Sequence, residues 1–354
     1  MKHIILTLDY ELFGNGKGNV FTHVVEPADK LMRLARKNGA RYTIFFEVVE
    51  YWRLKEEWER GNTMGYDKNP IAAMEEQIRE AVRDGHDVQL HIHPQWVKAH
   101  WSDNGWVLNM DDYRLGDYKG EGEDSLVNIL RRGKETLENL IAPVKPYYKC
   151  VALRCGGYNA QPSESIVKAM REVGLFFDSS IYPGGYENGR LSFYDYRSVP
   201  ADNGLWPVSD RLDTISETTS DIYELPIVSM KVERWRKYCS MERVSGFFSN
   251  VRTSKEMLET KVSGNGARSV SMGGKFKFLL GTECQTWDFC LLPANIHKRF
   301  VRLMAQQPDR KYFTLVGHPK SYVGSKNLLF LLKLLNQNNC EFNTIANLYN
   351  KYVK

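Results

Sequence analysis

The sequence lacks the patterns that mark several large classes of protein. None of its 6 cysteines forms a Cys-x-x-Cys pair, which argues against a cysteine-type zinc site and against a disulfide framework. No stretch reaches about 18 apolar residues, the length that suggests a membrane span, and the longest apolar-rich run, 328–335, contains a lysine. No Gly-x-Gly-x-x-Gly turn follows a strand-like run, so a dinucleotide-binding fold has no support.

Charge and composition exclude further classes. The formal net charge of +5 is dispersed, without a run of about five or six like charges, and it does not indicate a nucleic-acid binder. Hydrophobic residues make up 42% of the 354 residues, which is enough for a sizeable core. The apolar run at 4–8 is too short for a signal peptide. We therefore expect a cytoplasmic protein with reduced thiols and no transmembrane segment.

Aromatic residues are plentiful, at 12% of the chain with 8 Trp and 19 Tyr. A pyranose has an apolar face that can stack on an aromatic ring, so an aromatic-rich surface suits a sugar ligand. Packing in the core is still the commoner role of any single ring.

Strand-like and helix-like segments alternate over the first 180 residues. The predicted strands cover residues 4–8, 42–46, 88–93, 147–153 and 175–179, and the predicted helices cover residues 27–37, 70–83, 125–141 and 163–173. After residue 293 we predict helices at 294–305, 326–335 and 345–352 and a strand at 312–316. This alternation indicates βαβ units and a parallel sheet, either a barrel or a doubly wound sheet.

Residues 183–292 interrupt this order. They read as a loop-rich insertion with a strand near 222–228. We interpret residues 1–354 as a single domain that carries this insertion. One role open to residues 231–292 is to cap the mouth of the fold and set substrate choice.

Polar clusters directly follow three of the predicted strands. Asp9 and Glu11 follow the first, His91 and His93 end the third, and His318 follows the strand near the end of the chain. In parallel α/β folds the functional residues gather at the carboxyl ends of strands. We therefore expect these side chains to meet at one edge of the sheet.

The spacing of these residues favours metal chemistry. His91 and His93 are two apart on a strand and share a face, and two imidazoles with nearby carboxylates suit zinc or another transition ion. Of Asp9 and Glu11, one can ligate the ion and the other can act as a base toward water. A hydrogen-bonded histidine pair and a solvated acidic turn are the plainer alternatives.

Two further residues complete the candidate site. Arg154 ends a predicted strand, where it can hold a catalytic carboxylate and lower its pKa. His318 is a candidate general acid. A surface arginine and a structural histidine are the corresponding alternatives without a catalytic role.

The order of these motifs resembles the NodB-homology polysaccharide deacetylases of carbohydrate esterase family 4. Four segments carry the resemblance: Leu-Thr-Leu-Asp9-Tyr-Glu11, Gly85-His-Asp-Val-Gln-Leu-His91-Ile-His93, Ala152-Leu-Arg154-Cys-Gly-Gly-Tyr158 and Leu315-Val-Gly-His318. The resemblance implies a distorted barrel of seven βα units with an irregular insertion. It also implies that Asp9 is the base and that Glu11, His91 and His93 hold a divalent metal, with Zn²⁺ first and Co²⁺, Ni²⁺ or Mn²⁺ as alternatives.

The chain departs from the family pattern at two places. Tyr10 separates two acids that are usually adjacent. The second family histidine stands four residues after the first, where this chain has Gln95, and His93 is the candidate substitute. The family has a fourth motif, an Asp/Trp motif whose Asp orients the late histidine, and several segments of this chain compete as its counterpart. Its candidates are Asp178, with Asp195 and Asp202 as competitors, and Trp206 as an aromatic wall.

The resemblance implies a metal-dependent hydrolase that removes an acyl group from the amide nitrogen of a sugar in a polysaccharide or its precursor. We place substrate contacts at Tyr10, Gln95, Tyr158, Asp178 and Trp206. Two alternatives stay open: an amidohydrolase acting on a small non-sugar amide, and a catalytically inactive glycan-binding barrel.

Overall fold

A computed structural model of the chain describes residues 1–103, 105–235 and 280–353. Its centre is a sheet of parallel strands in the order β7-β6-β3-β2-β1-β14, with β11 beside β7. The bounds of these strands are β1 His3–Tyr10, β2 Tyr42–Glu47, β3 Asp87–Ile92, β6 Ala152–Cys155, β7 Phe177–Asp178, β11 Tyr223–Glu224 and β14 Tyr312–Gly317. Parallel neighbours place the carboxyl ends of all these strands at one edge, as the alternating sequence pattern predicted.

The sheet closes on itself through the residues that follow β11. Leu225 and Ile227 donate backbone hydrogen bonds to Asp178 and Ile181, which continues the ladder beside β7. On the other side Val228 donates to Thr314 of β14, and Ile227 forms a parallel bridge with Thr314. The result is an irregular ring of seven strands, and the prediction of a distorted seven-unit α/β barrel is confirmed.

Side chains alternate between the inside and the outside of this ring. In β1, Ile5 packs with the interior cluster that includes Phe45 and Leu225, whereas Ile4 belongs to the cluster outside the ring. Helix α12 (Ile345–Tyr352) covers the amino-terminal end of the ring, because its first backbone N–H donates to Thr43 and its apolar residues join the interior cluster. The amino-terminal end of the ring is therefore closed, and the other end is free to form a mouth.

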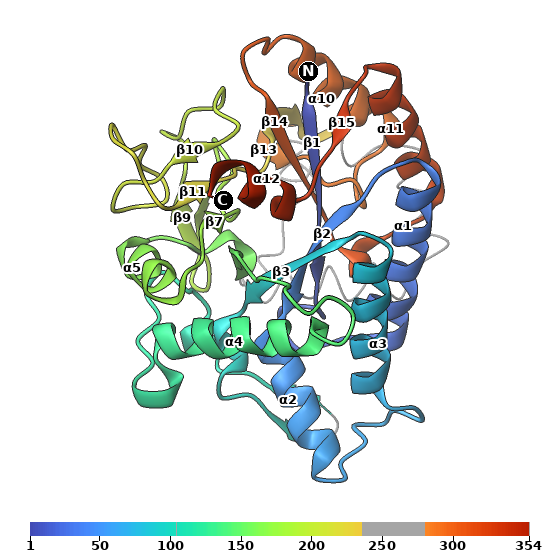
Figure 1. Cartoon of the computed structure of the whole chain (residues 1–354), viewed down its shortest axis with the longest axis vertical. Coiled ribbons are helices and arrows are strands. Elements are labelled where there is room, and N and C mark those ends of the chain that lie inside the picture. The colour runs from blue at the N-terminus through green and yellow to red at the C-terminus, as the bar shows by residue number, and fades with distance from the viewer. Residues whose placement is uncertain (104, 236–279, 354) are drawn as a thin grey trace.

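Helices follow most strands and cover the outside of the ring (Figure 1). Their bounds are α1 Glu26–Lys37, α2 Val48–Glu59, α3 Pro70–Arg83, α4 Leu126–Ile141, α5 Glu164–Val173, α10 Ala294–Ala305 and α11 Ser325–Gln337. Asn69 stands directly before Pro70 and caps helix α3, because its side chain accepts from the backbone N–H groups of Ile71 and Ala72. Helix α5 ends at Gly174, whose backbone is in the left-handed conformation. Helix α2 was not predicted.

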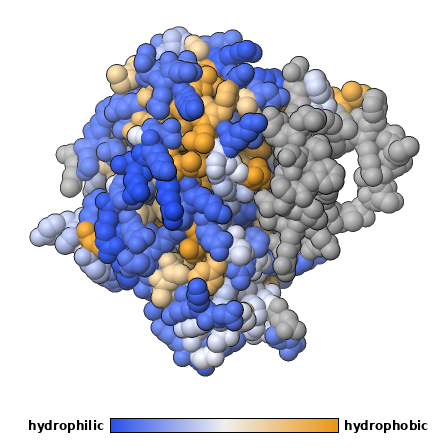
Figure 2. Space-filling model, turned by 90° about the vertical axis from the view of Figure 1, so that its right-hand side faces the viewer, coloured by the Kyte–Doolittle hydropathy of each residue, from blue (hydrophilic) through white to orange (hydrophobic). Residues whose placement is uncertain are grey.

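The face that carries α1, α3 and α11 is mainly hydrophilic, with apolar residues gathered in a band (Figure 2). The outer residues of α1 explain part of this surface, since Arg33, Arg36 and Lys37 are exposed there. Within the described residues, no helix combines the length and the apolar character needed to span a membrane.

Short elements decorate the ring and its mouth. The remaining strands are β4 His100–Ser102, β5 Gly105–Val107, β8 Tyr186–Asn188, β9 Phe193–Asp195, β10 Trp206–Pro207, β12 Ser229–Glu233, β13 Thr282–Thr286 and β15 Glu341–Phe342. Single turns of 3-10 or π helix are η1 Val20–Val25, η2 Pro94–Trp96, η3 Met110–Asp112, η4 Gly122–Asp124, η5 Gly156–Tyr158 and η6 Pro319–Ser321. Residues 236–279, which make up much of the insertion predicted at 183–292, lie outside the described residues.

Candidate active site

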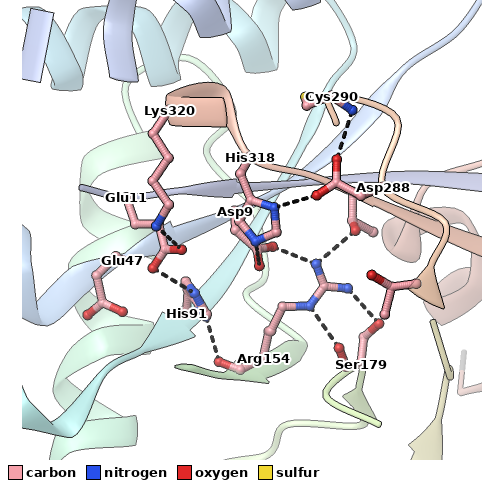
Figure 3. Close-up of polar contacts among 12 residues, drawn as sticks. Asp9, Glu11, Glu47, His91, Arg154, Ser179, Asp288, Cys290, His318 and Lys320 are labelled. Atoms are coloured by element: carbon pink, nitrogen blue, oxygen red, sulfur yellow. Dashed lines mark hydrogen bonds and ion pairs between the residues drawn. The ribbon is translucent and has the colours of Figure 1, made fainter. Parts of the chain in front are cut away.

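The strand register brings the predicted site residues together. His91 of β3 stands beside Glu47 of β2 and Arg154 of β6. Leu8 of β1 pairs with Gly317 of β14, so Asp9 and His318 are neighbours at the next step. Because all these strands run in parallel, their last residues project into the same mouth (Figure 3).

Asp9 forms a buried ion pair with Arg154. The Asp9 Oδ1 to Arg154 Nη1 distance is 2.6 Å, and the arginine side chain is fully buried. The guanidinium is fixed by its hydrogen bonds to Thr7 Oγ1, to the Ser179 carbonyl and to Ser179 Oγ, and it lies over the Phe45 ring. Burial alone would raise the pKa of Asp9, but the Arg154 charge and the nearby His318 outweigh it and hold that pKa well below its usual range.

His318 lies between two carboxylates. Its Nε2 is 3.4 Å from Asp9 Oδ2, and its Nδ1 is 3.0 Å from Asp288 Oδ2. Burial opposes the charged ring, but the hydrogen bonds and charges of Asp288 and Asp9 prevail and raise the pKa of His318 to about 10. The site therefore holds an imidazolium at neutral pH, which is the protonation state of a general acid.

Asp288, not Asp178, orients His318. Backbone N–H groups of Cys290 and Leu291 donate to Asp288 Oδ1 and hold its Oδ2 toward the imidazole. Asp178 instead accepts from the backbone and hydroxyl of Ser180 and is fully buried beside β11. The two competing predictions fail as well, because Asp195 pairs with Arg197 and Asp202 accepts from Gln307.

A second cluster surrounds Glu11. Its Oε2 is 3.3 Å from His91 Nε2 and 3.0 Å from His93 Nδ1, while His93 Nδ1 is also 2.8 Å from Glu47 Oε2. Its Oε1 accepts from Lys320 Nζ at 2.6 Å. Burial favours the neutral acid, but Lys320 and the histidines outweigh it and keep the pKa of Glu11 well below its ordinary value.

The donor set of this cluster fits a divalent transition metal. Glu11, Glu47, His91 and His93 are all buried, and each offers one ligand atom within 4.8 Å of the others. His91 Nδ1 donates to the Arg154 carbonyl, which leaves Nε2 as the ligating atom of the neutral ring. That Nε2 is buried and forms no well-directed hydrogen bond among the described residues. Two imidazoles and two carboxylates are ordinary zinc ligands.

Gly156 allows His93 to take its place in the cluster. A Cβ at this position would lie 2.3 to 2.6 Å from three atoms of the His93 ring. The turn η5, which directly follows β6, therefore forms one wall against which the imidazole packs.

The predicted substrate contacts are divided between the mouth and the core. Side chains of β1 alternate between the two faces of the sheet, and Tyr10 points outward. There its hydroxyl donates to Gln77 and its ring stacks on Phe46. Trp206 is 1% exposed and donates to the Leu212 carbonyl. The structure places these two rings in the core instead of at the mouth.

Tyr158 and Gln95 remain near the site. Tyr158 is close enough to Asp9 and Asp288 that their charges, added to burial, raise its pKa well above its ordinary value. Gln95 is fully buried, its Nε2 donates to the Gly14 carbonyl at 3.4 Å, and its Oε1 has no partner among the described residues.

Three residues of the site were missed from the sequence: Glu47, Asp288 and Lys320. Glu47 directly follows the buried run 42–46, which is the signal that identified Asp9 after its own strand. Asp288 follows Trp287, in a segment without regular periodicity that gave no reason to single it out. Lys320 lies two residues after His318 and had no separate signal.

Comparisons with known proteins add the following. No family model matches the sequence, and a search of curated proteins gives no match. The solved structure of the polysaccharide deacetylase Bc1974 from Bacillus cereus has 11% identity and a TM-score of 0.39, over 97% of this chain and 92% of that one. This chain is similar in structure to polysaccharide deacetylases, as its motifs predicted.

Proteins with other names match at the same level. The PuuE allantoinase has 10% identity and a TM-score of 0.43, over 98% of this chain and 88% of that one. The 4-alpha-glucanotransferase from Thermococcus litoralis has 12% identity and a TM-score of 0.46, over 100% of this chain but 39% of that one. These likenesses assign no activity to this chain.

Proposed function

We propose that this protein is a metal-dependent hydrolase that removes an acetyl or other acyl group from the amide nitrogen of a sugar, in a polysaccharide or its precursor. One observation carries the proposal. An ionised Asp9 and a protonated His318 face each other at the mouth of the ring, directly beside the Glu11, His91 and His93 donors. A base, an acid and a candidate metal site close together are the groups that metal-assisted amide hydrolysis uses.

Glu11, His91 and His93 are the residues that would hold the ion, with Glu47 beside His93. A bound Zn²⁺ would supply Lewis acidity toward the acyl carbonyl and toward a water molecule. His93 Nδ1 faces both Glu11 Oε2 and Glu47 Oε2, so an ion bound at Nδ1 would take the place of the hydrogen bond to Glu47 and could recruit that carboxylate as a further ligand.

The roles of the other residues follow from their protonation states. Asp9 stays ionised because Arg154 compensates its buried charge, and its Oδ2, which faces His318, is the oxygen that accepts a proton from water. His318 carries a proton at Nε2 and can deliver it to the leaving amine, while Asp288 stabilises the charged ring. The hydrogen bonds of the Arg154 side chain go to Asp9 and to backbone or hydroxyl oxygens, so Arg154 is a positioning residue.

Lys320 favours one second candidate, a catalytically inactive glycan-binding barrel. Its ammonium lies 2.6 Å from Glu11 Oε1 and neutralises the central carboxylate of the candidate metal site without an ion. A barrel stabilised in this way needs no metal to fold.

Metal analysis and an activity screen test the proposal together. Purified protein is assayed for bound metal and then incubated with N-acetylated sugars and with small non-sugar amides, each with added Zn²⁺ or Co²⁺. We expect acetate release from the sugars, retention of metal but loss of turnover in Asp9→Asn, and loss of both in His91→Ala. Full activity in Asp9→Asn would remove Asp9 as the base. A protein that takes up no metal and cleaves nothing would support the inactive barrel.

A further inference from the structure

We propose that Lys320 is a built-in counter-ion of the candidate metal site, which competes with a divalent ion for Glu11 and stabilises the protein when no ion is bound. The inference rests on the metal binding proposed above. It concerns how tightly the site holds an ion and goes beyond which residues hold it.

Lys320 is held in place by contacts on several sides. It belongs to η6, the single turn that directly follows His318, and its side chain is 12% exposed. Its Nζ donates to Glu11 Oε1 at 2.6 Å and to the Leu12 carbonyl at 2.7 Å, and it lies over the Phe13 ring. Figure 3 shows the ammonium pointing at Glu11 from the side opposite His91. The contact joins a buried carboxylate to a half-buried ammonium, unlike a surface ion pair.

The two oxygens of Glu11 have different partners. Oε1 accepts from Lys320, whereas Oε2 faces His91 and His93. An ion held between Glu11 and the histidines would use Oε2, and Lys320 would keep Oε1 for itself. The lysine therefore limits how much of the carboxylate charge is available to an ion.

The balance of charge explains why the chain would keep a lysine here. Arg154 compensates Asp9 at the neighbouring position, whereas Glu11 and Glu47 lie together and, in the part of the chain that the structure describes, form no ion pair with an arginine. A buried carboxylate that loses its partner is strongly destabilising. Lys320 compensates Glu11 and so allows the ring to fold before any ion arrives.

The same charge opposes an ion. An ammonium and a divalent cation bound to one carboxylate lie only a few ångströms apart, and their repulsion in a partly buried site is only weakly screened. We expect removal of the ammonium to raise the affinity for Zn²⁺ at least tenfold, provided that the carboxylate keeps its position.

The experiment compares four proteins: the wild type, Lys320→Met, Lys320→Arg and Lys326→Met. Methionine keeps an unbranched stem that can pack on Phe13, arginine keeps the charge, and Lys326 is an exposed lysine of α11. Zn²⁺ affinity is measured by calorimetric titration of metal-free protein, and thermal unfolding is followed with and without Zn²⁺. Lys320→Met should bind at least tenfold more tightly, melt at a lower temperature without metal, and gain more from added Zn²⁺. The other two variants should resemble the wild type.

The outcomes separate the two proposals. If the wild type binds Zn²⁺ and Lys320→Met binds it equally or more weakly, Lys320 is no competitor and this inference is overturned, while the metal site stands. If none of the four proteins binds Zn²⁺, the metal site itself fails and the inference fails with it. Should Lys320→Met not fold, Lys320→Gln replaces it, because the glutamine amide can still donate to Glu11 without a charge, and the same affinity comparison decides.

Discussion

Replacing Gly156 by alanine tests whether the close approach of the chain to His93 shapes the site. The added Cβ would lie 2.3 Å from Cδ2, 2.5 Å from Cγ and 2.6 Å from Nε2 of the His93 ring. Carbon atoms in contact normally lie about 3.5 to 4.0 Å apart, so the imidazole would have to retreat by roughly 1 Å. The backbone φ at Gly156 is not in the left-handed region, so the effect reports on space and not on backbone strain.

The expected loss has two parts. Crowding a packed site costs about 1–3 kcal/mol. A retreat of this size also takes His93 Nδ1, now 3.0 Å from Glu11 and 2.8 Å from Glu47, out of good hydrogen-bond range, which costs about 1.5–3 kcal/mol for a bond to a charged group. We therefore expect the free energy of unfolding to fall by roughly 2.5–6 kcal/mol. If His93 ligates the ion, Zn²⁺ affinity should fall at least about tenfold as well.

Urea denaturation and calorimetric Zn²⁺ titration measure the two effects. Gly105→Ala is the matched control, since a Cβ at Gly105 meets nothing within 4 Å, and it should change stability by less than about 0.5 kcal/mol. A Gly156→Ala protein that unfolds and binds Zn²⁺ like the wild type would refute the reasoning. Normal Zn²⁺ affinity with reduced stability would instead show that His93 is structural and would direct attention to Glu47 as a ligand.

Two further predictions concern the base and the acid. Arg154→Met removes the guanidinium that pairs with the buried Asp9, so the free energy of unfolding at pH 7 should fall by about 3–5 kcal/mol. Urea denaturation measures this change, and a loss below about 1 kcal/mol would contradict the role of the ion pair. Asp288→Asn removes the orienting carboxylate of His318, so the pKa of His318 should fall from about 10, as an NMR titration of its ring protons would show. Because that pKa is raised in the folded state, its contribution to stability is complete below about pH 6.5 and is lost as the pH rises through about 10. In Asp288→Asn this contribution should be smaller and should be lost completely at a lower pH, and an unchanged pH profile would exclude Asp288 as the cause.

The strands of the ring could be predicted because their residues are buried on both faces and form short apolar runs between helices. The candidate base, acid and metal ligands followed from this, since each stands at the carboxyl end of such a run. Helix α2 escaped prediction for a local reason. It begins at Val48 directly after β2, without a loop, and its first residues are β-branched or aromatic, types that favour a strand.

The partner of His318 could not be read from local pattern. Asp288 reaches the imidazole because its neighbours lie between two segments, the residues that follow β11 and strand β14. Trp287 donates to Val228 of the first segment, and Phe289 donates to Val316 of the second. A segment that pairs through so few residues has no periodicity. Asp178 lies within the predicted strand 175–179 and was the more obvious candidate, but its carboxylate accepts from the backbone and the hydroxyl of Ser180.

The position of Asp288 ties the chemistry of the site to the completeness of the fold. Trp287 to Phe289 occupy the seam at which the ring closes, through backbone hydrogen bonds to Val228 and Val316. A chain in which this seam is still open keeps Asp9 near His318 but lacks Asp288, the other carboxylate that holds a proton on the imidazole. Under the function proposed above, such a chain would have a weaker proton donor. Full hydrolytic competence would then depend on closure of the ring.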